Sequence, residues 1–168
     1  MARAWREWVR FIAASADSRE FYSHEHGSLM SAPVTGLELE LPIVTEDDIV
    51  RARTRGREMC RTLGFAEINQ VKIATAISEL ARNIFHYAKT GEIILRIIST
   101  PKRGIEVVAR DRGPGIPDIK LVLSGNYKSR TGMGKGLLGA RRLVDHFEVV
   151  SAPGQGTTVT LRKYADAR

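Results

Sequence analysis

Hydrophobic and polar residues alternate in a short stretch near residue 40. Leu37, Leu39 and Leu41 are separated by Glu38 and Glu40. Successive side chains of a strand point to opposite faces, so this alternation predicts a strand with one buried and one exposed face. The ordered part of the chain is therefore expected to begin near this strand.

A helix is predicted directly after this strand. The segment Thr45–Asp48 resembles a capping box, in which a threonine hydroxyl and an acidic side chain three residues later each bind the other residue's backbone amide. The helix should continue to about Leu63, and Gly64 is typical of the position just past a helix end. Its buried side is expected to consist of Ile49, Ala52, Met59 and Leu63.

A second and longer helix is predicted from about residue 66 to residue 88. Its apolar residues recur every three or four positions, and Lys89-Thr90-Gly91 ends the pattern. The stripe expected to be buried consists of Ile68, Val71, Ala74, Ile77, Ala81, Ile84, Phe85 and Ala88.

The rest of the pattern predicts four strands and one more helix. Strands at 92–99 and 105–110 are joined by a turn-prone segment, and the first is so apolar that it should be central in its sheet. A helix at 137–145 precedes a hairpin of strands 146–151 and 157–162. Because strands and helices do not alternate regularly, the expected fold class is α+β. The expected architecture is a two-layer sandwich with a mixed, mostly antiparallel sheet and helices on one face.

Size and composition fit one globular domain preceded by an extension. The 168 residues are 43% apolar, and no run approaches the ~20 apolar residues that span a membrane. Residues 33–168 are expected to form the domain. Residues 1–32 are expected to be an N-terminal extension, either a short amphipathic helix around Trp5 and Trp8 or a disordered tail.

Cysteine usage and the first residues indicate the compartment. The chain has a single cysteine, Cys60, which cannot form an internal disulfide, and no signal peptide is recognisable at the N-terminus. The cytoplasm is therefore the expected location, and Cys60 is interpreted as a buried apolar residue rather than a nucleophile.

The formal charge of +7 allows several kinds of acidic partner. One group of basic residues falls on the first predicted helix and is interpreted as its solvated face, with a binding patch as the alternative. These residues are Arg51, Arg53, Arg55, Arg57 and Arg61. No basic surface interleaved with aromatic residues, of the kind that stacks on bases, is recognisable, so nucleic acid is not expected as a partner.

The second predicted helix carries an acidic and an amide side chain one turn apart. Glu79 and Asn83 occupy positions i and i+4, so both leave the same face, which is opposite the predicted apolar stripe. Their oxygen atoms can hold a hard cation and its waters. Both residue types are also common on exposed helix faces, so the pair alone is weak support for a site.

A tight turn follows the strand predicted at 105–110. Asp111 is followed by Gly113-Pro114-Gly115, and glycines in such a turn let a ligand approach the backbone closely. An aspartate at a strand end can accept a hydrogen bond from an exocyclic amine such as that of adenine. An ordinary tight turn is the alternative interpretation.

Alternating glycines precede the helix predicted at 137–145. Gly132, Gly134 and Gly136 present backbone amides near a helix N-terminus, where an anion is stabilised. Their spacing fits neither a P-loop nor a dinucleotide-binding turn, and a flexible basic loop is the alternative interpretation. The neighbouring cations that could attend phosphates are Lys128, Arg130 and Lys135.

The order of these segments resembles that of one ATPase fold. A helical Glu-x-x-x-Asn is followed by Asp-x-Gly-x-Gly after a strand, by Gly-x-Gly-x-Gly before a helix, and by Gly156-Thr157-Thr158 in the last strand. This order is similar to that of the Bergerat (GHKL) fold, which gyrase, Hsp90, histidine kinases and MutL share. The resemblance covers about Leu37 to Lys163.

Within that superfamily the chain resembles the small serine/threonine switch kinases of bacterial stressosomes and, more distantly, the anti-sigma factor kinases. The segments that carry this resemblance are Ala76–Ile84, Asp111–Ile119 and Gly134–Gly139, with Arg82 before Asn83 typical of the switch kinases. Lys135 and the first 32 residues depart from the pattern.

The resemblance implies a role for each residue singled out above. Glu79 would act as general base toward the attacking hydroxyl, and Asn83 would coordinate the Mg²⁺ that bridges the ATP phosphates. Asp111 would bind the adenine amine with the help of Thr157. A lid at about 124–136, expected to be mobile without nucleotide, would cover the phosphates. The glycines and cations expected to contact the nucleotide are Gly113, Gly115, Lys128, Arg130, Gly132, Gly134, Lys135 and Gly136.

The resemblance also implies partners. A serine or threonine of a STAS-domain protein would receive the phosphate, and a PP2C-type phosphatase would be a further partner that the kinase activates. Two alternatives stay open: an anti-sigma factor that sequesters a sigma factor, and a nucleotide-binding interaction module without catalysis. The presence of Glu79 argues against the second alternative.

Overall fold

The computed structural model describes residues 34–124 and 135–165 of the chain. The predicted N-terminal extension and most of the predicted lid lie outside these residues. The described elements are β1 (Val34–Ile43), α2 (Glu46–Thr62), α3 (Glu67–Asn83), the π-helix η1 (Ile84–Ala88), β2 (Gly91–Ile98), β3 (Gly104–Asp111), α4 (Ile119–Leu123), α5 (Lys135–Leu143), β4 (His146–Ser151) and β5 (Thr157–Tyr164).

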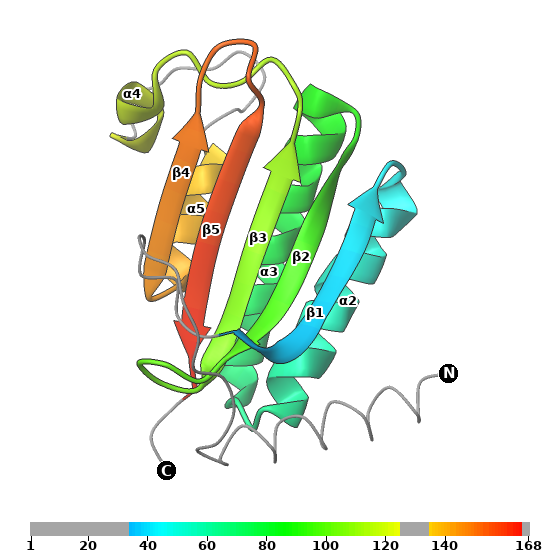
Figure 1. The fold of residues 1–168 in the computed structure, drawn as a ribbon, viewed down its shortest axis with the longest axis vertical. Helices are drawn as coiled ribbons and strands as arrows, with labels where there is room; N and C mark the ends of the chain where they lie inside the picture. Colours follow the sequence, from blue (N-terminus) through cyan, green and yellow to red (C-terminus); the bar gives the residue numbers. More distant parts are fainter. Residues whose placement is uncertain (1–33, 125–134, 166–168) are drawn as a thin grey trace, which may run out of the picture.

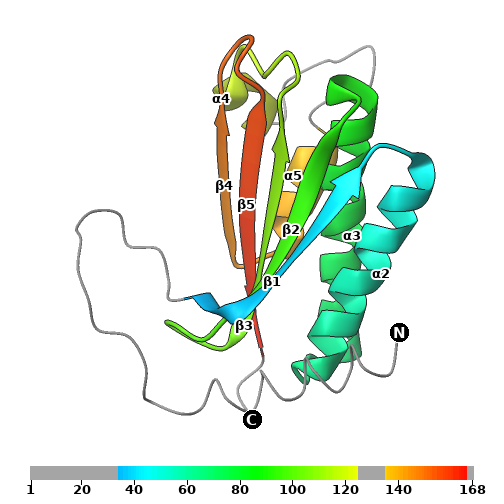
Figure 2. The ribbon, with the colours of Figure 1, turned by 45° about the vertical axis from the view of Figure 1, so that its right-hand side comes forward.

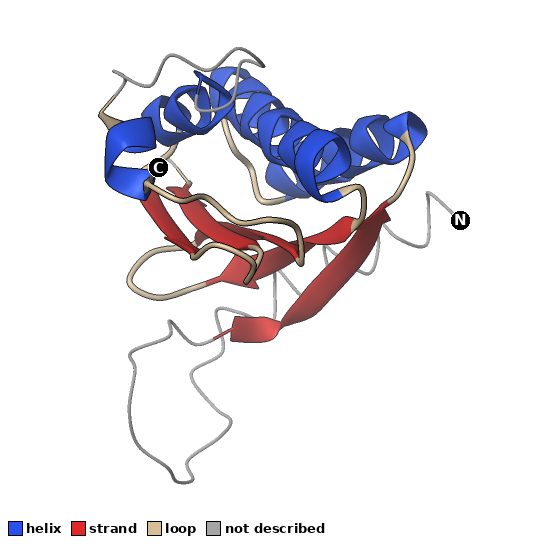
Figure 3. Cartoon of the chain, turned by 90° about the horizontal axis from the view of Figure 1, so that it is seen from above, coloured by secondary structure: helices blue, strands red, loops and turns tan. Residues whose placement is uncertain are grey.

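The strands form one twisted sheet that carries its helices on one face (Figure 1). Its five strands lie in the order β1-β2-β3-β5-β4, and every neighbouring pair is antiparallel. Figure 3 shows the two layers, with the helices above the sheet. The predicted fold class, an α+β two-layer sandwich, is confirmed, and β2 lies between β1 and β3, as its apolar sequence predicts.

The core lies between the sheet and the helices α2, α3 and α5. Alternate residues of β2, namely Ile93, Leu95 and Ile97, belong to this core, as expected for a strand whose side chains alternate between faces. On the opposite face, the buried Glu106 accepts hydrogen bonds from Arg96 at 3.2 Å and from Arg162 at 2.7 Å. These cross-strand pairs connect β2, β3 and β5 on the side without helices.

The start of α2 matches the predicted capping pattern on its acidic side. The Asp48 carboxylate accepts hydrogen bonds from the backbone amides of Val44 at 2.9 Å and Thr45 at 2.8 Å. These amides would otherwise be unpaired at the helix N-terminus. The four residues predicted for the buried side of α2 are all buried, and Cys60 is buried beside them. Burial raises the pKa of the Cys60 thiol to about 12, which keeps it protonated.

The predicted buried stripe of α3 is wrong at its N-terminal end. Ile68 is 62% exposed and Val71 is 43% exposed, whereas Ile73 and Leu80 are in the core. The misplacement arises because α3 also buries polar residues, which hides the true stripe from a hydrophobic pattern. Ser78 is one of them, and its hydroxyl donates to the Ala74 carbonyl at 2.9 Å, so it is buried without an unpaired polar group.

The remaining elements largely agree with the pattern. The helix predicted at 137–145 is α5, and the predicted hairpin is β4 and β5. The short helix α4 was not predicted; Asp118 caps it by accepting from the Leu121 amide at 2.8 Å. Within residues 34–124 and 135–165, no helix has the length and hydrophobicity needed to cross a bilayer.

Candidate functional site

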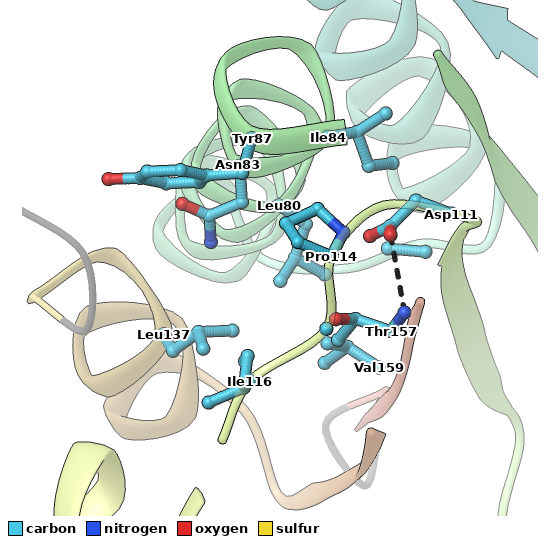
Figure 4. A pocket seen from close by; sticks show the side chains of 12 residues that line it. Leu80, Asn83, Ile84, Tyr87, Asp111, Pro114, Ile116, Leu137, Thr157 and Val159 are labelled. Carbon is cyan, nitrogen blue, oxygen red and sulfur yellow. Dashed lines mark hydrogen bonds between the residues drawn. The ribbon is translucent and has the colours of Figure 1, made fainter. Parts of the chain in front are cut away.

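A cavity opens where the end of α3 faces the end of β3 and the start of β5 (Figure 4). Its volume is about 510 Å³, including space that is open to solvent. Segments far apart in the sequence form its wall. The lining residues are Leu80, Asn83, Ile84, Tyr87, Ala109, Asp111, Pro114, Gly115, Ile116, Leu137, Thr157 and Val159.

Asp111 is held at one end of this cavity by the backbone. One carboxylate oxygen, Oδ1, accepts hydrogen bonds from the amides of Gly113 at 2.8 Å and Thr157 at 3.2 Å. The bond to Thr157 is the dashed line in Figure 4. The other oxygen, Oδ2, makes no hydrogen bond to any residue of the described ranges. The carboxylate is therefore oriented by one oxygen and can accept from a ligand with the other.

The turn after Asp111 is tied to the β4–β5 hairpin. The Ser151 hydroxyl accepts from the Ile116 amide at 2.9 Å and donates to the Gly156 carbonyl at 2.7 Å. The approach is so close that a Cβ on Gly115 would lie 2.0 Å from the Ala152 carbonyl oxygen, and Gly115 has a φ of +71°, which favours glycine. This end of the cavity is thus built from two connected turns.

The walls between the polar groups are apolar. Leu80 and Ile84 line the cavity from the helix side, Val159 lines it from β5, and Ile116 lines it from the loop after β3 (Figure 4). Tyr87 lies near Asn83 in the same view. An apolar slot with a single carboxylate at its end fits a flat heteroaromatic ring that carries one amine donor.

Glu79 and Asn83 lie at the other end of the site, and α5 approaches them closely. A Cβ on Gly136 would lie 2.7 Å from Glu79 Oε2 and 3.7 Å from Asn83 Oδ1. The Glu79 side chain is 30% exposed, and its Oε1 accepts from Arg82 Nη1 at 3.1 Å. The first turn of α5 therefore meets the acidic and amide side chains that were singled out on α3.

One expectation about this pair is corrected by the structure. Asn83 does not lie opposite the buried side of α3, because it lines the cavity together with Leu80 and Ile84. The true apolar stripe includes Leu80 and is rotated from the predicted one. The side-chain carboxamide of Asn83 consequently borders the apolar slot rather than open solvent.

Other predicted site residues are outside this arrangement or outside the described residues. Gly113 does not line the cavity, and a Cβ there would lie 2.6 Å from the Ala88 Cβ. Lys135 is the exposed first residue of α5 and does not line the cavity. The candidates outside the described residues are Lys128, Arg130, Gly132 and Gly134.

Two polar contributors to the site were missed by the sequence analysis. Tyr87 lines the cavity from η1, and its position four residues after Asn83 is a signal that could have identified it. Ser151 joins the Asp111 turn to the hairpin, but the Ile116 amide that it binds is 35 residues away in sequence. No local pattern points to such a contact.

The donor set is compatible with Mg²⁺ bound through a nucleotide. The described residues contain no group of three or more His, Cys, Asp or Glu side chains placed to hold a metal by themselves. Mg²⁺ commonly takes only one or two protein oxygens and completes its shell with phosphate oxygens and water. The Asn83 carboxamide on the cavity wall suits the role of such a single ligand.

Residues 68–166 match the histidine kinase-, DNA gyrase B-, and HSP90-like ATPase family, and the chain belongs to this family. It is an ATP-binding domain of that class, as the order of its motifs predicted.

Similarity to individual relatives points to the protein kinases of this family. The chain is 46% identical over 123 residues to serine/threonine-protein kinase RsbT of Bacillus subtilis, covering 73% of this chain and 92% of the relative. It is 36% identical over 101 residues to the anti-sigma F factor of Caldanaerobacter subterraneus, covering 55% of this chain and 68% of that protein. The predicted enzyme class, a protein serine/threonine kinase, is confirmed by the homology to RsbT.

A solved structure agrees with the fold. The crystal structure of the RsbU and RsbW domains of Rv1364c from Mycobacterium tuberculosis superposes with a TM-score of 0.57 at 18% identity. The match covers 80% of this chain and 34% of the solved chain. At this identity the similarity concerns the fold alone.

Proposed function

We propose that the chain is an ATP- and Mg²⁺-dependent serine/threonine kinase of a cytoplasmic partner-switching module, and that it phosphorylates a STAS-domain protein. The observation that supports this most is that Asn83 lines the apolar cavity that ends at Asp111, while Gly136 of α5 closely approaches both Asn83 and Glu79. A PP2C-type phosphatase is the further partner expected for such a kinase.

The apolar slot is proposed to hold the adenine ring. Asp111 Oδ2 would accept a hydrogen bond from the exocyclic amine, while Oδ1 keeps its bonds to the backbone. The Thr157 side chain lines the same end of the cavity and would contact the base directly or through water. Gly115 lines it without a side chain, so the ring can lie against the backbone.

The phosphates are proposed to lie toward α5. Asn83 Oδ1 would supply the protein ligand to Mg²⁺, and the amide of Gly136 lies in the first turn of α5, where a helix N-terminus favours an anion. Bound Mg²⁺ would neutralise charge on the phosphates during transfer. The further phosphate contacts expected from the sequence are Lys128, Arg130, Gly132, Gly134 and Lys135.

Glu79 is proposed to accept the proton of the attacking hydroxyl. As the serine or threonine oxygen forms its bond to the γ-phosphorus, the bond from that phosphorus to the bridging oxygen breaks and ADP leaves. The proton passes to the Glu79 carboxylate. Arg82 holds one oxygen of this carboxylate at 3.1 Å, which leaves the second oxygen for the substrate.

Phosphate transfer to a STAS-domain protein from the same operon, followed with labelled ATP and Mg²⁺, tests this function. Glu79→Gln should abolish transfer while ATP affinity, measured by calorimetry, stays within about twofold, because only the proton acceptor is lost. Glu148→Gln, a change at an exposed site on β4, should leave both the phosphate transfer and the ATP affinity unchanged. A folded, ATP-bound wild-type protein that transfers no phosphate would refute the kinase assignment. Unchanged transfer by Glu79→Gln would remove Glu79 as the base.

A second candidate function is the sequestration of a sigma factor. The similarity to anti-sigma F factors favours it. Affinity purification of the chain from its own cells distinguishes the two functions. Recovery of a sigma factor without a STAS-domain protein or a phosphatase would favour the anti-sigma factor.

A further inference from the structure

Ser151 has three polar neighbours at the end of the cavity where Asp111 lies. The β4–β5 turn and the loop after β3 lie side by side at one end of the sheet in Figure 1 and Figure 2, and Ser151 joins them. Its hydroxyl accepts from the Ile116 amide at 2.9 Å and donates to the Gly156 carbonyl at 2.7 Å. The third neighbour is the Thr157 hydroxyl, whose Oγ1 lies 3.0 Å from Ser151 Oγ.

The direction of the hydrogen bond between the two hydroxyls follows from their protons. A serine hydroxyl has one proton to donate and two lone pairs that accept. A carbonyl oxygen can only accept, so the Ser151 proton points to the Gly156 carbonyl. Ser151 Oγ must then accept from Thr157, and this bond uses the one proton of the Thr157 hydroxyl. The Ile116 amide occupies the second lone pair of Ser151.

The backbone around Ser151 holds this arrangement in place. The Gly154 amide donates to the Pro114 carbonyl at 2.8 Å. A Cβ on Gly156 would lie 2.1 Å from the Asp111 carbonyl oxygen, and Gly156 has a φ of +76°, which favours glycine. The carbonyl that accepts from Ser151 therefore belongs to a segment packed tightly against another backbone segment. The Ser151 proton cannot turn to Thr157 without leaving this carbonyl unpaired.

The proton of Thr157 matters because its side chain lines the cavity next to Asp111 (Figure 4). Asn83 and Tyr87 are the other lining side chains with a proton to donate, and they lie together on the helix side. Among the described lining residues, Thr157 is thus the side chain that can donate to a ligand group placed beside Asp111. With its proton bound to Ser151, the Thr157 hydroxyl can only accept.

We propose that Ser151 is a positioning residue that determines specificity for the nucleotide base, an inference that rests on the proposed ATP site. By binding the Thr157 proton, Ser151 leaves only side-chain acceptors where Asp111 Oδ2 would accept from the amine of the base. A base with an oxo group in place of that amine would meet these acceptors and find no side-chain donor. Ser151 does not line the cavity, so it excludes such a base without touching the nucleotide.

Calorimetry with ATP and with inosine triphosphate, each with Mg²⁺, tests this proposal. Inosine triphosphate carries an oxo group where ATP carries the amine, and the wild type should bind it at least about tenfold more weakly. Ser151→Ala frees the Thr157 proton for the oxo group. The ratio of the two dissociation constants, inosine triphosphate over ATP, should then fall about fivefold, the size of one neutral hydrogen bond. General loosening of the hairpin would weaken both nucleotides alike and leave the ratio unchanged.

Thr157→Val shows whether the freed proton is the cause. Without a hydroxyl at position 157, adding Ser151→Ala should leave the ratio within about twofold of that of Thr157→Val alone. Thr157→Val by itself should not raise the ratio, since the wild-type threonine has no proton for the oxo group. A rise would overturn the proposal even if Ser151→Ala does not fold. Ser151→Thr keeps the hydroxyl and should have the wild-type ratio.

Thr160→Val is the matched control, because it removes a hydroxyl from the same strand, β5. Its neighbours Val159 and Leu161 belong to the core, so the side chain of Thr160 points to the face without helices. Thr160→Val should bind both nucleotides with the wild-type ratio.

The outcomes separate this proposal from the function on which it rests. ATP binding with an unchanged ratio in Ser151→Ala would overturn the role of Ser151 and leave the kinase function standing. An equal fall in the ratio with and without the Thr157 hydroxyl would also overturn it. A fall that needs this hydroxyl, in a protein that transfers no phosphate, would support the role of Ser151 and refute the kinase assignment. A wild-type protein that binds neither nucleotide would overturn both.

Discussion

Asp111 shows how one side chain serves both the fold and the candidate site. Its Oδ1 atom accepts two backbone hydrogen bonds, and these fix the direction of Oδ2. A carboxylate held in this way needs no reorganisation when a ligand amine arrives. The selectivity of the cavity for an amine donor would then come from a single oriented oxygen.

Replacing Asp111 by asparagine tests this division of roles. In Asp111→Asn the amide oxygen can keep the backbone bonds, so the amide nitrogen then meets the ligand amine, donor against donor. A hydrogen bond to a charged group contributes about 1.5–3 kcal/mol, so ATP affinity should fall at least about tenfold in calorimetry. Asp47→Asn, an exposed change on α2, should bind ATP like the wild type. Equal affinities for ATP in both variants would show that Asp111 does not contact the base.

The element that departs most from its predicted form is the helix that carries Glu79 and Asn83. The sequence predicted one α-helix from 66 to 88, whereas the structure has an α-helix to Asn83 and a π-helix from Ile84 to Ala88. Helix propensity and apolar spacing do not distinguish these forms over a single turn. The spacing of Glu79 and Asn83 was predictable because it lies in the regular part. Tyr87 lies on the π-helical turn, so its spacing from Asn83 could have suggested it as a site residue, but its exact placement could not be predicted.

Two glycines of α5 offer a matched test of how closely α5 packs against α3. A Cβ on Gly136 would meet Glu79 Oε2, whereas one on Gly139 would have no atom within 4 Å. Gly136→Ala should therefore displace the Glu79 carboxylate and lower the rate of phosphate transfer at least about tenfold. Gly139→Ala should keep full transfer and gain about 0.5–1 kcal/mol of stability, since alanine is the better helix former. Similar transfer rates for the two variants in the kinase assay would contradict this packing.

The start of α2 makes stability depend on pH. The backbone amides of Val44 and Thr45 donate to the Asp48 carboxylate and hold its pKa below the usual range. A pKa lowered by folding stabilises the folded state at neutral pH, and this contribution is lost as pH falls through the folded-state pKa. Asp48→Ala should cost about 1–2 kcal/mol at pH 7 in urea unfolding, and the difference from wild type should shrink below about pH 4.

A control separates capping from simple charge. Asp47 lies in the same first turn but is exposed, and no hydrogen bond to its side chain is found among the described residues. Asp47→Ala should cost at most about 0.5 kcal/mol, the size of an exposed charge at a helix N-terminus. If Asp47→Ala and Asp48→Ala lower the free energy of unfolding equally, the two hydrogen bonds to Asp48 do not contribute to stability.

At the scale of the whole molecule, the sequence predicted which segments form the site but not how they are joined. The order of Glu79 and Asn83, the Asp111 turn and the glycines before α5 was recognisable because each is a local pattern. The apolar walls, the rotation of the α3 stripe and the Ser151 bridge depend on contacts between distant segments. Local patterns of residues do not encode such contacts between distant segments.

The buried thiol reports on the stability of the whole domain. Cys60 is fully buried, and burial raises its pKa to about 12, so it should react with a thiol reagent only after unfolding. ATP with Mg²⁺ at about a hundred times its dissociation constant should slow labelling about a hundredfold, which corresponds to about 2.7 kcal/mol. The rate is measured with a chromogenic disulfide under native conditions. Labelling that is fast and insensitive to ATP would show that α2 opens locally.

The bridge at Ser151 bears on how this fold can tolerate insertions. The β4–β5 turn is bonded to the turn that follows Asp111, so added residues at 152–156 would move the proposed acceptor for the base. The β2–β3 turn at 99–103 lies at the far end of the same sheet and does not contribute to the cavity (Figure 1). Related chains should therefore vary in length at the β2–β3 turn and keep the length of the β4–β5 turn constant. A fluorescent or affinity tag is best inserted at 100–103.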